Sequence, residues 1–151
     1  MALDIVDFIP DAQAVEDGVW LDLDEDTKVK VRYLSPDAYQ NELVKRQRRV
    51  RNPKLLEHVG YLRGIENDLL RTCIMDWTGM RKGGKEFPFS QESLDFVIAS
   101  GSEVRIMLLR IVQDVSNFTT KQREENEKNL PTASSGISLS NGGGEISGEQ
   151  N

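Results

Sequence analysis

Cysteine and histidine are almost absent from this sequence, which has one of each, Cys73 and His58. A single cysteine excludes an intramolecular disulfide bond and, with only one histidine, argues against a Cys/His zinc site. Cys73 falls on the apolar face of an expected helix, which favours a buried structural thiol over a nucleophile. His58 has no serine or cysteine in its sequence context that marks it as a catalytic base. We therefore expect no enzyme, no metal and no cofactor.

Long apolar runs and an excess of positive charge are also missing. No segment approaches the roughly 20 apolar residues that cross a bilayer, and the N-terminus, MALDIVDFIPDAQ, lacks the basic region of a secretion signal. We expect a protein of a reducing cytosol without membrane contact. The formal net charge is -6 at pH 7, so the field of the whole molecule does not favour nucleic acid or anionic lipid.

Three regions differ in composition along the 151 residues, which suffice for one domain and are too few for two. Residues 1–17 are acidic and mixed, and we expect a flexible N-terminal arm. Residues 18–129 carry periodic apolar patterns and form the expected domain. Residues 130–151 are rich in serine and glycine and lack aromatic residues, which predicts a disordered tail. The expected fold is mainly α, a small helical domain with an N-terminal β-hairpin and a disordered C-terminal tail.

Alternating apolar residues open this domain. In GVWLDLDEDTKVKVRYL, Val29, Val31 and Tyr33 recur with period two, which predicts a hairpin with one buried face. The acidic turn DLDED has the alternating aspartates of a calcium loop. It lacks the loop glycine and the closing acidic residue, so a solvated turn is favoured.

Helical periodicity follows, with serines placed as N-caps and glycine or proline near the ends. The four expected helices run from Ser35 to Pro53, from near Lys54 to Met75, from Ser90 to Gly101, and from Ser102 to Phe118. The charged segment TTKQREENEKN is expected to continue as a solvent-facing helix or a fraying end.

The segment DWTGMRKGGKEFPFS, residues 76–90, has a glycine-rich basic tip that suggests a phosphate cradle. A phosphate-binding loop needs its glycines between a strand and a helix, with lysine and serine or threonine at the helix start. Here the helix begins only after FPFS, and no lysine directly precedes Ser90. We favour a turn that joins two helices, in which Phe87 and Phe89 pack beside the cap as a hydrophobic staple.

A second segment, KRQRRVRNPK, concentrates positive charge on the first helix. Its residues could follow a phosphate backbone, which gives a nucleic-acid hypothesis. No aromatic residues interleave with the cations and no helix-turn-helix glycine turn follows, so a solvated helix face that balances the acidic arm is favoured. The candidate nucleic-acid contacts are Lys45, Arg46, Arg48, Arg49 and Arg51.

The order of these features resembles the tail assembly chaperones of long-tailed, siphovirus-type bacteriophages. GVWLDL leads into a hairpin, a basic helix follows, a helix ends in DWTG, a glycine turn precedes FPFS, and NF and EENEKN close the domain. The resemblance covers residues 18–129, and it rests on order and spacing because each motif is short. One departure is the turn MRKGGKE, which in the family is commonly acidic and of the Asp-Gly kind.

The resemblance implies a small, mainly helical protein made in the cytoplasm of an infected bacterium. Such chaperones bind the aggregation-prone tape-measure protein, keep it soluble, help recruit tail-tube subunits, and are absent from the finished virion. A longer form is often made in that family by ribosomal frameshifting, and this chain resembles the short form. Two other functions stay open: a nucleic-acid-binding accessory protein, and a structural head–tail or tail-completion component that remains in the particle.

Several apolar residues are candidates for contact with the tape-measure protein or for self-association. The run VRIMLLRIV carries more apolar residues than one inward stripe needs, and Ile106, Met107 and Leu109 fall outside that stripe. A tape-measure helix could pack against such residues in a helix-in-groove arrangement. The alternative is a fully buried central helix. The candidate set is completed by the aromatic residues Trp77, Phe87 and Phe89.

Overall fold

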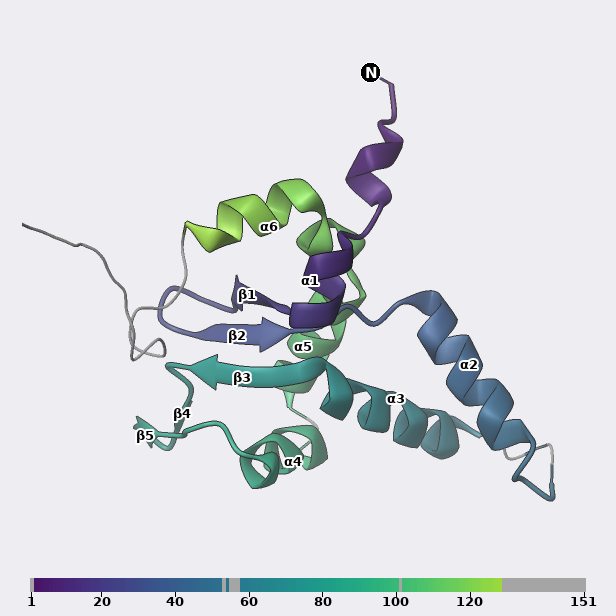
Figure 1. Cartoon of the computed structure of the whole chain (residues 1–151). Coiled ribbons are helices and arrows are strands. Elements are labelled where there is room, and N and C mark those ends of the chain that lie inside the picture. The colour runs from purple at the N-terminus through teal and green to yellow at the C-terminus, as the bar shows by residue number, and fades with distance from the viewer. Residues whose placement is uncertain (1, 53, 55–57, 101, 129–151) are drawn as a thin grey trace, which may run out of the picture.

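The chain folds around a small antiparallel sheet, seen in a computed structural model that describes residues 2–52, 54, 58–100 and 102–128 (Figure 1). Strands β1 (Val19–Asp22) and β2 (Lys28–Val31) form the predicted N-terminal hairpin. The fold is mainly helical, as predicted. The predicted disordered tail, residues 130–151, lies outside the described residues, as do Pro53 and Gly101 at the predicted helix boundaries.

The sheet has a third strand, β3 (Ile74–Thr78), which pairs with β2 in the order β1-β2-β3. Val29 lies opposite Leu21 on one side and Trp77 on the other. Because β2 is central, Val29 and Val31 are completely buried. The period-two pattern seen in the sequence is therefore the inward face of the middle strand.

The third strand corrects the prediction that a helix extends to Met75. Helix α3 (Val59–Cys73) ends at Cys73, and the chain becomes extended at Ile74. Isoleucine, tryptophan and threonine in the segment IMDWT suit a pleated, half-buried surface. This segment becomes a strand because it pairs with β2, which lies more than forty residues earlier in the sequence. The spacing of apolar residues in the local sequence cannot reveal that partner.

The glycine-rich turn is also different from its prediction. It is a second hairpin, in which β4 (Arg81–Lys82) pairs with β5 (Lys85–Glu86), and so it does not join two helices directly. Gly83 and Gly84 have φ angles of 59° and 81°. A two-residue hairpin loop of type I′ needs positive φ at both positions, which glycine adopts without steric cost.

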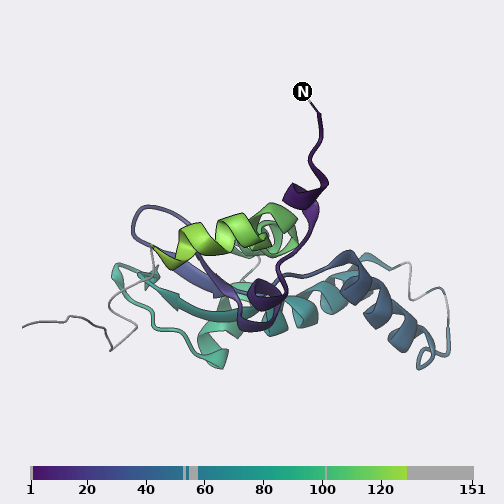
Figure 2. The same ribbon diagram turned by 45° about the horizontal axis from the view of Figure 1, so that its top comes forward.

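Four helices surround the sheet or extend from it: α2 (Pro36–Gln47), α3, α4 (Gln91–Ala99) and α5 (Glu103–Gln113). Two predicted caps are confirmed, since the hydroxyl of Ser35 accepts from the Ala38 amide at 3.1 Å and that of Ser90 accepts from the Ser93 amide at 3.0 Å. Ser102 occupies the N-cap position of α5 without a side-chain cap bond. Both views show α2 beside α3 at one end of the molecule (Figures 1 and 2).

The predicted four-turn helix from Ser102 to Phe118 is interrupted. Helix α5 ends at Gln113, and a 3-10 helix, η3 (Val115–Phe118), precedes α6 (Thr120–Glu127). The carboxylate of Asp114 accepts from the Ser116 amide at 3.0 Å and starts this tighter turn. Side chains of this type compete with a continuing helix by bonding the local backbone. Within the described segments, the helices are too short or too polar to cross a membrane.

The N-terminal arm is shorter than the predicted 1–17. Helix α1 (Ala12–Asp17) belongs to the domain, because Ala14 is buried and Asp11 joins α1 to α6. The Asp11 carboxylate caps α1, accepts from the Thr120 hydroxyl at 2.8 Å, and pairs with Arg123 at 3.2 Å. The residues before Asp11 include a short 3-10 helix, η1 (Ile5–Phe8), and project from the body (Figures 1 and 2).

We expect acid to weaken the attachment of α1. The hydrogen bond from Thr120, the amide of Ala14 and the guanidinium of Arg123 lower the pKa of Asp11 from 3.8 to about 2. Since the folded pKa is the lower one, the stability from Asp11 is complete above about pH 4 and is lost as pH falls towards 2. Urea unfolding of wild type and Asp11→Asn between pH 2 and 5 measures this. Their difference in unfolding free energy should shrink across the window, and a constant difference would contradict the assignment.

A pair of glycine substitutions should separate backbone strain from steric contact. Gly79 has a φ of 78°, and an added Cβ would lie 1.9 Å from the Asp26 carbonyl oxygen; Gly83 also has positive φ but has open space around it. Gly83→Ala should cost about 1–2 kcal/mol of unfolding free energy from the left-handed backbone. Gly79→Ala should cost at least about 3 kcal/mol because overpacking adds to that strain. Equal losses in chemical denaturation would show that the Asp26 contact is unimportant.

Candidate partner-binding surfaces

The orientation of α5 is set by an arginine on its inward face. Arg105, Leu108 and Val112 are buried and form one stripe. The Arg105 side chain is 10% exposed; its Nε donates to Asn67 Oδ1 at 2.7 Å and its Nη2 donates to Glu66 Oε1 at 2.6 Å. A buried charge is tolerated when it is paired and hydrogen-bonded in this way. Arg105 therefore fixes the rotation of α5 against α3.

This rotation places two of the three predicted α5 contacts outward. Ile106 is 38% exposed and Met107 is 37% exposed. Leu109 is partly buried and packs against the core, so it is less accessible to a partner than Ile106 and Met107. The reason is helical geometry, because Leu109 lies four residues after Arg105 and so shares its face.

A shallow cavity lies next to Ile106. Its volume is about 260 Å³, and its lining comes from α3, from the end of α4 and from α5. Ligand pockets usually have roughly 300–1,000 Å³, so this cavity suits the insertion of a side chain better than a small molecule. The residues that line it include Arg63, Asn67, Ile98, Ala99, Arg105 and Ile106. We define Ile106, Met107 and this cavity as the α5 surface.

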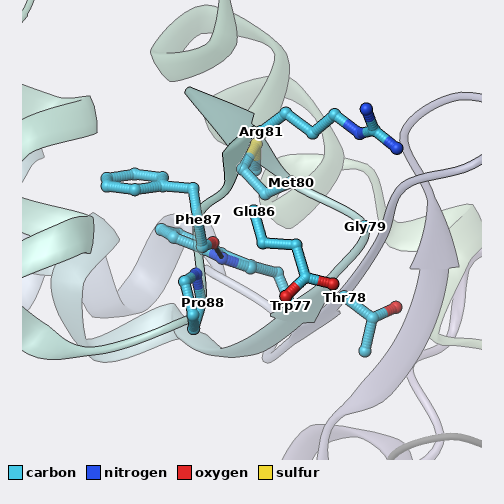
Figure 3. A pocket seen from close by; sticks show the side chains of 8 residues that line it. All are labelled: Trp77, Thr78, Gly79, Met80, Arg81, Glu86, Phe87 and Pro88. Carbon is cyan, nitrogen blue, oxygen red and sulfur yellow. Dashed lines mark hydrogen bonds between the residues drawn. The ribbon is translucent and has the colours of Figure 1, made fainter. Parts of the chain in front are cut away.

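The aromatic candidates form a structural cluster. Trp77 is buried, and its indole Nε1 donates to the Phe87 carbonyl oxygen at 2.7 Å (Figure 3). The Trp77 ring lies 5.9 Å from Phe87 and 4.9 Å from Phe89, measured between ring centroids. Trp77 is therefore a core residue and not an accessible contact, which corrects its prediction. Phe87 and Phe89 are partly buried and pack against the core.

Phe96 is an exposed aromatic residue that was not singled out from the sequence. Phe96 on α4 is 48% exposed and its ring meets Phe87 edge to face, with centroids 5.9 Å apart. The available signal is its place in LDFVIA, where Leu94, Val97 and Ile98 form the buried stripe and Phe96 falls outside it. An apolar residue outside the inward stripe of a helix marks accessible surface.

The predicted nucleic-acid contacts divide into two groups. Arg46 is engaged within the domain, because its guanidinium binds Asp68 at 2.6 Å, and this hydrogen bond raises the pKa of Arg46. Lys45, Arg48, Arg49 and Arg51 are exposed at the end of α2 and just after it. These four cations therefore remain the candidate nucleic-acid contacts. Arg46 is no longer among them, because it holds α2 against α3.

Cys73 and His58 are the residues that were considered for catalysis or metal binding. Cys73 is buried, and burial raises the pKa of its thiol, which disfavours the reactive thiolate. His58 starts α3, where its Nδ1 accepts from the Gly60 amide at 3.2 Å. Among the residues with described positions, there is no group of three or more histidine, cysteine, aspartate or glutamate side chains arranged to hold a metal ion.

Comparison of the chain with protein-family models, curated proteins and solved structures finds no match. The resemblance to tail assembly chaperones therefore rests on the motifs of residues 18–129 alone. The geometry described above concerns only which surfaces are open to a partner.

We expect the Arg105 contact to contribute strongly to stability. Arg105→Ala leaves Glu66 and Asn67 without their partner and opens a gap in the α5 stripe, so it should lower the unfolding free energy by roughly 2–4 kcal/mol. Arg110→Ala is the matched control, because Arg110 is an exposed arginine on the same helix. It should change stability by no more than about 0.5 kcal/mol. Similar losses for both variants in urea denaturation would contradict the role of Arg105.

Proposed function

We propose that this protein is a tail assembly chaperone of a long-tailed bacteriophage. In this proposal it binds the tape-measure protein in the cytoplasm of the host bacterium, keeps it soluble, and helps to recruit tail-tube subunits. It leaves before the virion is complete. The identity of the partner is supported by the order of motifs from GVWLDL to EENEKN. The mode of binding is supported by the α5 surface.

The observation that supports this mode of binding is that Ile106 and Met107 face outward on a helix whose rotation is fixed. A flexible apolar loop would lose conformational entropy when it bound a partner, and a side chain on a rigid helix loses less. The neighbouring cavity of about 260 Å³, whose lining includes Arg63, Asn67 and Ser102, offers a place for one protruding side chain of the partner. Exposed Glu103 and Arg110 border the apolar residues along α5. This combination of an apolar centre and a charged border is common at protein interfaces.

The partner that fits this surface is an amphipathic helix. A tape-measure chain is largely helical with apolar stripes, and such stripes aggregate when they are left uncovered. One helix laid along α5 could contact Ile106 and Met107 and insert a side chain into the cavity beside Ile106. This is the helix-in-groove mode of recognition. Covering the stripe in this way would keep the tape-measure protein in solution.

Co-expression with the tape-measure protein of the same phage tests the proposal, with an affinity tag on one chain only. Wild type should keep the tape-measure protein soluble and co-purify with it. The double variant Ile106→Glu and Met107→Glu should lower the co-purified amount at least about tenfold, because two buried charges would enter an apolar contact. Val44→Glu is the matched control, since Val44 is an exposed apolar residue on α2, 47% exposed.

Circular dichroism must show that both variants are folded. Equal recovery of the tape-measure protein with the double variant and with wild type would contradict the role of the α5 surface. A tape-measure protein that stays insoluble with wild type would contradict the chaperone function itself. Mass spectrometry of purified virions distinguishes a chaperone, which is absent from the particle, from a structural tail component, which is present.

A further inference from the structure

The projecting segment of residues 3–9, here called the arm, displays an unusual amount of apolar surface. Each of its large apolar side chains is more than half exposed, and η1 buries none of its residues. Contiguous exposed apolar residues of this kind mark interaction sites. Two acidic residues, Asp4 and Asp7, lie among them. The apolar members are Leu3, Ile5, Val6, Phe8 and Ile9.

The arm has a defined direction and local shape. The Asp4 carboxylate accepts from the Val6 amide at 3.0 Å and caps η1. At the other end, Asp11 holds the chain to α6 through Thr120 and Arg123. Because both ends of η1 are defined, less conformational entropy is lost when the arm binds a partner.

A surface of complementary character lies on the second hairpin and α4. The Lys82 ammonium is 4.0 Å from the centroid of the Phe96 ring and 5.6 Å from that of Phe87. Lys85 is exposed and pairs with Lys82 across the hairpin, so the two lysines share one face; Arg81 pairs with Glu86 on the other face. We define Phe87, Phe96, Lys82 and Lys85 as the basic aromatic patch. A cavity of about 250 Å³ adjoins it, and its lining includes Met80, Arg81, Glu86, Phe87 and Pro88 (Figure 3).

We propose that the arm of one copy of this protein binds the basic aromatic patch of a second copy. The apolar side chains of the arm match the rings of Phe87 and Phe96, and its two aspartates match Lys82 and Lys85. Figure 1 shows the arm beyond α1 and the patch on the far side of the sheet, by β4, β5 and α4. The arm therefore points away from the patch of its own chain. This proposal does not depend on the chaperone function.

The contact joins two different surfaces, so it is heterologous. In a dimer, one copy keeps an unused arm and the other keeps an unused patch, unless the assembly closes into a ring. Larger species therefore form as the concentration rises. The charged part of the contact is exposed, so added salt should weaken the association. A contact made by seven residues and a small patch is expected to be weak and transient, because it falls below the size of stable interfaces.

Sedimentation equilibrium of the full chain tests this contact, at concentrations up to roughly 1 mM to detect a weak interface. The arm variant combines Ile5→Ser with Phe8→Ser, and the patch variant combines Lys82→Glu with Phe96→Ser. Wild type should exceed the monomer mass with increasing concentration. Each variant alone should associate at least about tenfold more weakly. The combination Val44→Ser with Lys45→Glu changes an exposed apolar residue and an adjacent cation on α2, and it should behave as wild type.

Mixing the two variants gives the decisive result. The arm variant retains an intact patch and the patch variant retains an intact arm, so an equimolar mixture should form a 1:1 heterodimer that grows no further. Circular dichroism and thermal melting check that each variant is folded. A wild type that stays monomeric, variants that associate as wild type does, or a mixture without heterodimer would each overturn the proposal.

Discussion

The pairing of β2 with β3 is the constraint on which the rest of the structure depends. It converts a two-stranded hairpin, which is marginal by itself in water, into a sheet whose middle strand is buried. Trp77 lies opposite Val29 in this pairing and also binds the Phe87 carbonyl group through its indole. The same strand thus closes the core and positions the second hairpin, against which α4 packs through Phe87 and Phe96.

The two proposed interactions use different residues of this framework. Contact with a tape-measure helix uses α5, whereas contact between copies uses the arm and the hairpin that follows β3. Ile106 lies on α5 and Phe96 on α4, and the two helices meet at the cavity that Ile98 and Ala99 of α4 help to line. Several copies joined by their arms would present a series of α5 surfaces to one long partner. Such multivalent binding raises avidity without any new contact.

The sequence predicted the features that depend on near neighbours in the chain. Ser35 and Ser90 cap helices as expected, and alternation predicted the first hairpin, because these signals lie within a few residues of the structure they specify. The wrong predictions concern elements whose conformation depends on residues far away in the sequence. Strand β3 needs β2, Asp11 needs Thr120 more than one hundred residues away, and the inward orientation of Arg105 needs Glu66 and Asn67. Of the predicted α5 contacts, Ile106 and Met107 face outward, and Leu109 lies with the core because it shares the Arg105 face.

The order of the strands along the chain also affects how the protein is made. Val31 pairs with Ile74, so β2 is synthesised more than forty residues before the strand that covers it. At about 5–20 residues per second, the ribosome needs roughly 2–9 s to supply that strand. During this interval Val29 and Val31, which are completely buried in the finished domain, have no third strand to cover them. A nascent chain of this protein is thus open to aggregation for a few seconds before its own sheet closes.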